Sequence, residues 1–137
     1  ETIYQVPLDF ERFQMMEIIA KKLKLKNRHP DLQEWEKMVK KIKTAKKSVR
    51  IGLAGKYTEL DDAYLSVLEA IKAASFSQGF SPEIVWIDTE KIEKSEKAEL
   101  QKLHRVAGII VPGGFGKRGI EGKFRSPGIA EKNAFPI

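Results

Sequence analysis

Short apolar strands alternate with helical segments from Ser48 onward, and this alternation limits the possible folds more than any other feature of the chain. Each predicted strand is a short apolar run bounded by polar or turn residues, and apolar residues recur at helical spacing between the runs. The strands are predicted at residues 49–54, 83–87 and 107–111, and the helices at about 61–76 and 95–105. Three consecutive β-α units predict an α/β domain, a parallel sheet with helices on both faces. Such a sheet binds ligands at the carboxyl ends of its strands.

The N-terminal third of the chain lacks this alternation and is predicted to be mainly helical. Residues 3–7 alternate like the end of a strand and stop at a proline. Residues 8–24 carry apolar side chains at helical spacing, which predicts one amphipathic helix. Asp31 is the predicted N-cap of a second helix, with Glu34 completing a capping box. Residues 43–47 are rich in lysine and are predicted to be a linker to the α/β part.

A glycine-rich segment, residues 111–122, directly follows the third predicted strand and holds five of the ten glycines of the chain. This density costs backbone entropy, so we expect the segment to present backbone N–H groups to an oxyanion or a phosphate. Residues 114–119 fit the pattern G-x-G-x-x-G, but dinucleotide-binding folds carry that motif after their first strand and continue straight into a helix. Here we expect an irregular backbone through Gly122. A P-loop is excluded because Arg118 stands where Ser or Thr is required.

Two interpretations of this segment remain. In the first, successive N–H groups of Gly113 and Gly114, fixed by Pro112 at a strand end, form an oxyanion hole. Removing one such donor typically costs about 2.7–4 kcal/mol of transition-state stabilisation, which would explain glycines that tolerate no side chain. In the second, the segment is a tight turn that only clears a helix.

Composition excludes several kinds of site and partner. The absence of cysteine excludes disulfides, thiolate metal sites and a cysteine nucleophile within these 137 residues. We expect His29 and His104 to be exposed to solvent and not to bind a metal. The net charge is +6, and most of the basic excess lies between residues 21 and 50. Aromatic residues, which would stack on bases, are not regularly interspersed there. This favours a solvated helix face, or a surface that attracts an anionic ligand, over nucleic-acid binding. Without a signal peptide or an apolar run of about 20 residues, we expect a cytoplasmic protein that contacts no membrane.

Five segments of the chain occur in the order and spacing of the CTP synthases. They are Ile3-Tyr4-x-Val6-Pro7, Leu32-x-Glu34-Trp35, Ile51-Gly52-Leu53-Ala54-Gly55-Lys56-Tyr57, Asp62-Ala63-Tyr64-x-Ser66-Val67 and Val111-Pro112-Gly113-Gly114-Phe115-Gly116-x-Arg118-Gly119-x-Glu121-Gly122. The chain therefore resembles this family over nearly its whole length. The resemblance implies the C-terminal end of a synthetase domain at 1–26, an interdomain helix and linker at 27–47, and the N-terminal half of a class I glutamine amidotransferase domain at 48–137. It also implies an incomplete flavodoxin-like sheet with flanking helices, in which residues 134–137 approach a fourth strand.

The resemblance implies a two-site ligase of pyrimidine biosynthesis. In this family a Cys-His-Glu triad hydrolyses glutamine, and the ammonia travels to the synthetase domain. There it displaces the phosphorylated O4 of UTP at the expense of ATP with Mg²⁺, and GTP is the allosteric activator. The partners implied are UTP, glutamine, ATP and GTP, in a homodimer or homotetramer. The parts of the synthetase domain that bind ATP and Mg²⁺ lie outside these residues.

The resemblance also assigns roles to particular residues. These are oxyanion and glutamine binding for Gly113, Gly114 and Phe115, a lid linked to GTP activation for Arg118, Gly119 and Glu121, and nucleotide coupling for Lys56. Each role has a simpler alternative: Phe115 could anchor the lid, Arg118 could pair with Glu121 on the surface, and Lys56 could cap the sheet edge. Tyr64 and Ser66 are expected to be packing or surface positions.

Two features depart from the family pattern. The family's nucleophilic cysteine lies in a G-x-C-x-G turn after the fourth strand, expected just beyond Ile137, so we expect no catalytic residue in this chain and no activity from it alone. Pro127-Gly128 interrupts a helix that is continuous in the family, since an interior proline costs about 3 kcal/mol. We therefore expect that helix to begin late, with Ser126 as N-cap and Pro127 at its first position. The alternative function is a non-catalytic flavodoxin-like module that binds a nucleotide phosphate.

Overall fold

The computed structural model describes residues 2–26, 29–114 and 116–132. The chain divides into two compact units, residues 1–46 and 47–137. Among the described residues, no helix is both long enough and apolar enough to cross a membrane. The predicted assignment of residues 1–26, 27–47 and 48–137 to three parts of a larger enzyme stays a prediction.

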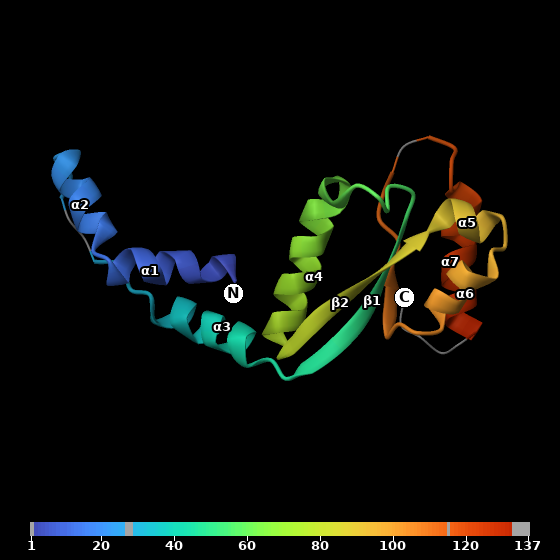
Figure 1. Ribbon diagram of the computed structural model, residues 1–137, viewed down its shortest axis with the longest axis horizontal. Helices are drawn as coiled ribbons and strands as arrows, with labels where there is room; N and C mark the ends of the chain where they lie inside the picture. The colour runs from blue at the N-terminus through green and yellow to red at the C-terminus, as the bar shows by residue number, and fades with distance from the viewer. Residues whose placement is uncertain (1, 27–28, 115, 133–137) are drawn as a thin grey trace. The chain divides into compact units, whose positions relative to one another are not determined.

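The second unit is built on a parallel sheet of three strands, β1 (Lys47–Gly55), β2 (Phe80–Asp88) and β3 (Gly108–Ile110), in the order β2-β1-β3 (Figure 1). In the register, Leu53 of β1 lies beside Trp86 of β2 and Ile110 of β3. The predicted α/β class and the predicted parallel sheet are confirmed. All three predicted strands exist, with β1 and β2 longer than predicted and β3 shorter. The predicted approach to a fourth strand lies outside the described residues.

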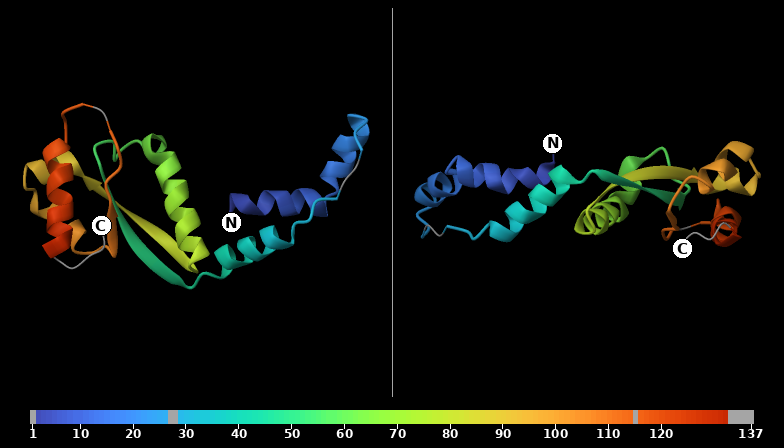
Figure 2. Two further views of the ribbon diagram at one scale, coloured as in Figure 1. Left: turned by 180° about the vertical axis from the view of Figure 1, so that it is seen from behind. Right: turned by 90° about the horizontal axis from the view of Figure 1, so that it is seen from below.

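Helices cover both faces of this sheet. They are η2 (Asp61–Tyr64) with α4 (Leu65–Ser77), then α5 (Thr89–Glu93), α6 (Lys97–Leu103) and α7 (Ile120–Lys132). Neighbouring residues of a strand point to opposite faces. Trp86 therefore faces the side where Tyr64 contacts its ring, and Ile87 faces the side where the helices α5, α6 and α7 gather (Figures 1 and 2).

The main hydrophobic core of this unit lies between the sheet and the group α5–α7. Its buried members are Ala54, Ile87, Ile92, Leu103, Val106 and Ile109, and Val85, Leu100, Val111 and Ile129 pack against them. Fully burying one such aliphatic side chain is worth about 1.5–3 kcal/mol. The core therefore fixes the carboxyl ends of the strands, where the candidate site begins.

The first unit consists of η1 (Ile3–Gln5), α1 (Val6–Arg12), α2 (Met15–Lys22) and α3 (Gln33–Thr44). The predicted strand end at residues 3–7 is wrong: the Thr2 side chain caps η1 by accepting a hydrogen bond from the N–H of Tyr4, and Pro7 occupies the first turn of α1. A proline costs little there because its missing N–H would have no helical partner. The predicted single helix at 8–24 is divided, since Gln14 adopts a left-handed conformation with φ 53°.

The predicted N-cap is wrong by one residue: Leu32 occupies the N-cap position of α3, and the carboxylate of Asp31, just before it, accepts a hydrogen bond of 3.1 Å from the N–H of Gln33. The predicted capping box does not form, since the Glu34 carboxylate bonds to the Lys37 ammonium at 2.6 Å. The indole N–H of Trp35 donates to the carbonyl of Tyr4 at 2.7 Å, which ties α3 to η1. The helix runs to Thr44, so the predicted lysine-rich linker is shorter than expected.

The largest correction concerns α7, which begins at Ile120 and contains Pro127 in its interior. The predictions of an irregular backbone through Gly122 and of a late helix start at Ser126 are both wrong. Contacts with α5, which was not predicted as a separate helix, stabilise α7. The Glu93 carboxylate accepts from the N–H groups of Glu121 (2.9 Å) and Gly122 (3.4 Å), and the buried Ser126 hydroxyl donates to the Gly122 carbonyl at 2.7 Å. The Ser126 bond lies within α7, whereas the two Glu93 bonds come from α5 and stabilise the start of α7, which forms despite an interior proline that costs about 3 kcal/mol.

Candidate functional site

The candidate site lies at the carboxyl edge of the sheet, where the loops after β1 and β3 meet. Because β1 and β3 are neighbouring parallel strands, their carboxyl ends share one edge. A Cβ atom placed on Gly116 would lie 3.5 Å from Nζ of Lys56, and one on Gly114 would lie 3.9 Å from Cε of the same lysine. The structure therefore brings Lys56 beside the glycine-rich segment, although the two are far apart in sequence.

The glycine-rich segment is irregular from Val111 to Gly114 and has left-handed backbone at two later glycines. Gly113 and Gly114 are exposed and lie in irregular backbone directly after β3. Gly116 has φ 82° and Gly119 has φ 70°, a left-handed region that residues with a side chain rarely adopt. Phe115, the predicted wall of the glutamine site, lies outside the described residues. The oxyanion role of Gly113 and Gly114 stays a prediction.

Lys123 is the residue of the site that the sequence analysis missed. Its ammonium donates a hydrogen bond of 2.8 Å to the carbonyl of Pro112, and a Cβ on Gly114 would lie 3.0 Å from its Nζ atom. Burial, together with the nearby positive charge of Lys56, lowers the pKa of Lys123, and Tyr57 opposes the shift. Two lysine side chains therefore lie at this loop, which gives it a positive electrostatic potential.

The backbone that carries Lys56 is fixed by an aromatic cluster. The hydroxyl of the buried Tyr64 accepts a hydrogen bond of 3.3 Å from the Lys56 N–H, and a Cβ on Gly55 would overlap the Tyr64 ring. The Lys56 ammonium lies 5.1 Å from the centre of the Tyr57 ring. The expected packing role of Tyr64 is confirmed. Next to this turn is a pocket of about 250 Å³, lined by Lys56, Tyr57, Thr58, Glu59, Leu60, Asp88 and Glu90.

The three predicted lid residues all contact α5. Arg118 is exposed, and its guanidinium lies 3.6 Å from the carboxylate of Glu90, so it pairs with Glu90 and not with Glu121, the partner of the simpler alternative. Gly119 is buried, and a Cβ there would overlap the hydroxyl of Thr89. The Glu121 N–H is bound by Glu93, as described above. The lid role itself stays a prediction, but α5 is now identified as the element against which these residues rest.

The contact between α5 and α7 is close and reciprocal. A Cβ on Gly122 would overlap the backbone carbonyl of Thr89, whose buried hydroxyl has no hydrogen-bond partner among the described residues. In the opposite direction, the Arg125 guanidinium donates to the carbonyls of Ile92 and Glu93, each at 3.1 Å. Sequence reasoning could have found Lys123 once α7 was started at Ile120, because helical side chains point back toward the N-terminus of their helix.

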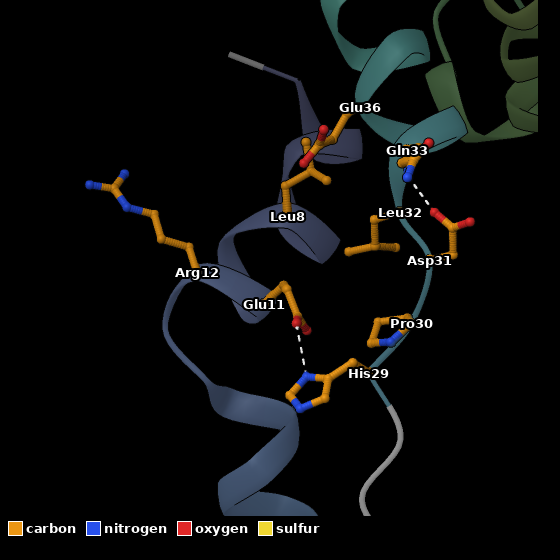
Figure 3. A pocket seen from close by; sticks show the side chains of 9 residues that line it. All are labelled: Leu8, Glu11, Arg12, His29, Pro30, Asp31, Leu32, Gln33 and Glu36. Carbon is orange, nitrogen blue, oxygen red and sulfur yellow. Dashed lines mark hydrogen bonds and ion pairs between the residues drawn. The ribbon is translucent and has the colours of Figure 1, made fainter.

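A second pocket, of about 590 Å³, lies in the first unit (Figure 3). It is lined by Leu8, Glu11, Arg12, His29, Pro30, Asp31, Leu32, Gln33 and Glu36. Here Nδ1 of His29 lies 3.5 Å from a carboxylate oxygen of Glu11. His29 and His104 are both exposed, as predicted. Within the described ranges, no group of three or more His, Asp or Glu side chains is arranged to hold a metal ion.

Comparison with known proteins identifies relatives of the whole chain. The sequence profile of the family described as glutamine amidotransferase class-I matches residues 59–137. All 137 residues align with the CTP synthases of Ruminiclostridium cellulolyticum, at 46% identity, and Pyrococcus abyssi, at 47%, and span 25% of each. A solved structure of the CTPS glutaminase domain of Trypanosoma brucei with bound acivicin is similar at TM-score 0.56 and 33% identity, over 65% of this chain and 34% of that one. The chain thus spans about a quarter of the length of the curated relatives it matches.

Proposed function

Because the chain belongs to the class-I glutamine amidotransferase family, we propose that it is part of a CTP synthase, which aminates UTP to CTP with ammonia released from glutamine. The observation that supports this most is the extent of the alignment. The family profile begins at residue 59, whereas the match to CTP synthases includes residues 1–58 as well. Residues 1–58 include the first unit and β1. The similarity to CTP synthases therefore extends beyond the residues that match the general amidotransferase family.

Within the proposed reaction, this chain supplies the backbone donors of the glutaminase site. When a thiolate attacks the carboxamide carbon of glutamine, the carbonyl oxygen becomes negatively charged. The N–H groups of Gly113 and Gly114 stabilise that charge, and Phe115 walls the glutamine side chain. The positive potential of Lys56 and Lys123 favours the same anion. The thiolate comes from a residue outside these 137, since they contain no cysteine.

Regulation is proposed to act through the lid residues Arg118, Gly119 and Glu121. The ion pair between Arg118 and Glu90 is exposed, and such pairs are worth about 0–1 kcal/mol, so GTP binding can break it at small cost. Lys56 couples the nucleotide to glutamine hydrolysis from the neighbouring loop. UTP, ATP and Mg²⁺ bind to other parts of the protein, and no step that involves them is assigned to this chain. The enzyme works in the cytoplasm as a homodimer or homotetramer.

The test is an assay of the full-length protein. CTP formation from UTP and ATP is measured with glutamine and, separately, with ammonium chloride, in the presence and absence of GTP. We expect CTP from both nitrogen sources and stimulation by GTP only with glutamine. The proposal would be refuted if the protein formed no CTP from glutamine or no CTP from ammonium chloride.

A second candidate function is a non-catalytic module that binds a nucleotide phosphate. The lysine pair beside the glycine-rich segment favours it, because two ammonium groups next to exposed loop N–H groups also suit a phosphate. Isothermal titration calorimetry of the full-length protein with GTP, in the absence of glutamine, together with a glutaminase assay, separates the two. Nucleotide binding without any glutamine hydrolysis would favour the module.

A further inference from the structure

The Pro112–Gly113 peptide group is held from one side by a side chain. Lys123 lies in the first turn of α7, and its ammonium donates to the Pro112 carbonyl at 2.8 Å. This carbonyl follows the end of β3, outside the ladder of the sheet. The bond from α7 is therefore a specific tether on the peptide that opens the glycine-rich segment.

The orientation of this carbonyl determines the orientation of the next N–H group. A peptide group is planar and trans, so its C=O and N–H bonds point in opposite directions. Since the Pro112 carbonyl points toward Lys123, the Gly113 N–H points away from it. Gly113 is exposed, and a Cβ built on its Cα atom would meet no described atom within 4 Å.

Lys123 is held firmly enough to act as a tether. Its helix is fixed by the Glu93 carboxylate at its first N–H groups and by Arg125 at the end of α5. The Lys123 side chain is half-buried, and this burial together with the repulsion from Lys56 lowers its pKa.

We propose that Lys123 is a positioning residue for glutamine hydrolysis: by holding the Pro112 carbonyl, it keeps the Gly113 N–H turned toward the developing oxyanion. The inference rests on the proposed function, in which Gly113 is an oxyanion donor. Lys123 touches neither glutamine nor the nucleophile in this role. It acts only through the orientation of one peptide group.

The experiment uses the full-length protein with three variants. Lys123→Met removes the donor and keeps a long side chain, Lys123→Arg keeps a donor, and Lys97→Met is the matched control at an exposed position of α6. For Lys123→Met we expect kcat of glutamine hydrolysis to fall about 10–100-fold, a smaller loss than removal of a whole oxyanion donor causes. KM for glutamine should stay within about threefold of the wild-type value. CTP formation from ammonia should be unchanged, and Lys123→Arg should recover most of the lost rate.

Three outcomes would overturn the inference. They are a Lys123→Met enzyme as active as Lys97→Met, a loss shared equally by the glutamine and ammonia reactions, and a loss confined to KM. A wild-type protein without glutaminase activity would instead refute the proposed function. In that case hydrogen exchange still tests the tether: the peptide containing residues 111–116 should exchange faster in Lys123→Met than in Lys97→Met, and equal rates would overturn it.

Discussion

At the scale of single residues, the site depends on glycines that leave room for two lysines. Gly114 and Gly116 lie beside the ammonium-bearing ends of Lys56 and Lys123, within the distance of an ordinary van der Waals contact or closer. A side chain at either glycine would compete with these groups for space. Glycine at these two positions therefore has a local cause, the close approach to the loop backbone of side chains from the loop after β1 and from α7.

Replacing Gly114 by alanine should reduce glutamine-dependent CTP formation about 10–100-fold and leave the ammonia-dependent reaction unchanged. The new Cβ would lie 3.0 Å from Nζ of Lys123, so either the lysine or the loop must move. Steady-state assays of the full-length protein with the two nitrogen sources measure this. Gly128→Ala is the matched control, because a Cβ there meets no described atom within 4 Å. Equal loss of both reactions in Gly114→Ala would show that the loop has only a structural role.

A second prediction concerns the lowered pKa of Lys123, which NMR titration of the lysine side chains can measure. Burial is the main cause and the charge of Lys56 the next, so Lys56→Gln should raise the pKa of Lys123 toward its ordinary value. Between the lowered folded pKa and the ordinary unfolded pKa, the unfolded chain binds more protons, so the free energy of unfolding should rise with pH in that window. Lys123→Met should abolish this rise. A Lys123 that titrates with the exposed lysines would contradict the prediction.

At the scale of secondary-structure elements, α5 and α7 stabilise each other's ends. The last residue of α5, Glu93, accepts hydrogen bonds from the first N–H groups of α7, and Arg125 of α7 satisfies carbonyls at the end of α5. Both helix termini would otherwise leave backbone groups without partners. This reciprocal capping places the start of α7, and with it Lys123, at a fixed position relative to β3.

Gly122→Ala should destabilise the second unit by about 1–3 kcal/mol, the usual cost of overpacking. The added Cβ would overlap the backbone carbonyl of Thr89, which cannot move aside as a flexible side chain can. Urea unfolding followed by circular dichroism measures the change in the free energy of unfolding. Gly128→Ala lies on the same helix without such a neighbour and serves as the control. A Gly122→Ala protein as stable as the control would mean that α5 and α7 separate easily.

At the scale of the whole molecule, the two units differ in how much apolar surface they bury. In the first unit the buried hydrophobic residues are Ala20 and Val39, whereas large apolar side chains such as Phe10, Phe13 and Ile18 are exposed. The second unit holds the main core. Local stability increases with the number of buried apolar contacts. The backbone amides of the second unit should therefore be better protected against hydrogen exchange than those of the first.

Hydrogen exchange of the 137-residue chain should therefore be faster in residues 2–46 than in residues 47–132. Peptides from β1 and β2 should be the slowest, because their backbone groups pair in the ladder of the sheet. Mass spectrometry of peptides after timed exchange gives the comparison. Equal protection of the two units would contradict it and would imply that the first unit is stabilised by something other than its own core.

The sequence by itself determined the α/β class, the parallel sheet and the position of the glycine-rich segment at its carboxyl edge. These follow from hydrophobic periodicity and from the order of strands and helices, which are local properties of the chain. Three features were decided only by the tertiary structure. They are the start of α7 at Ile120, the position of Pro127 inside that helix, and the hydrogen bond from Lys123 to the Pro112 carbonyl. Each depends on α5, because capping bonds and backbone contact from a separate helix outweigh the local preference of proline and glycine against a helix.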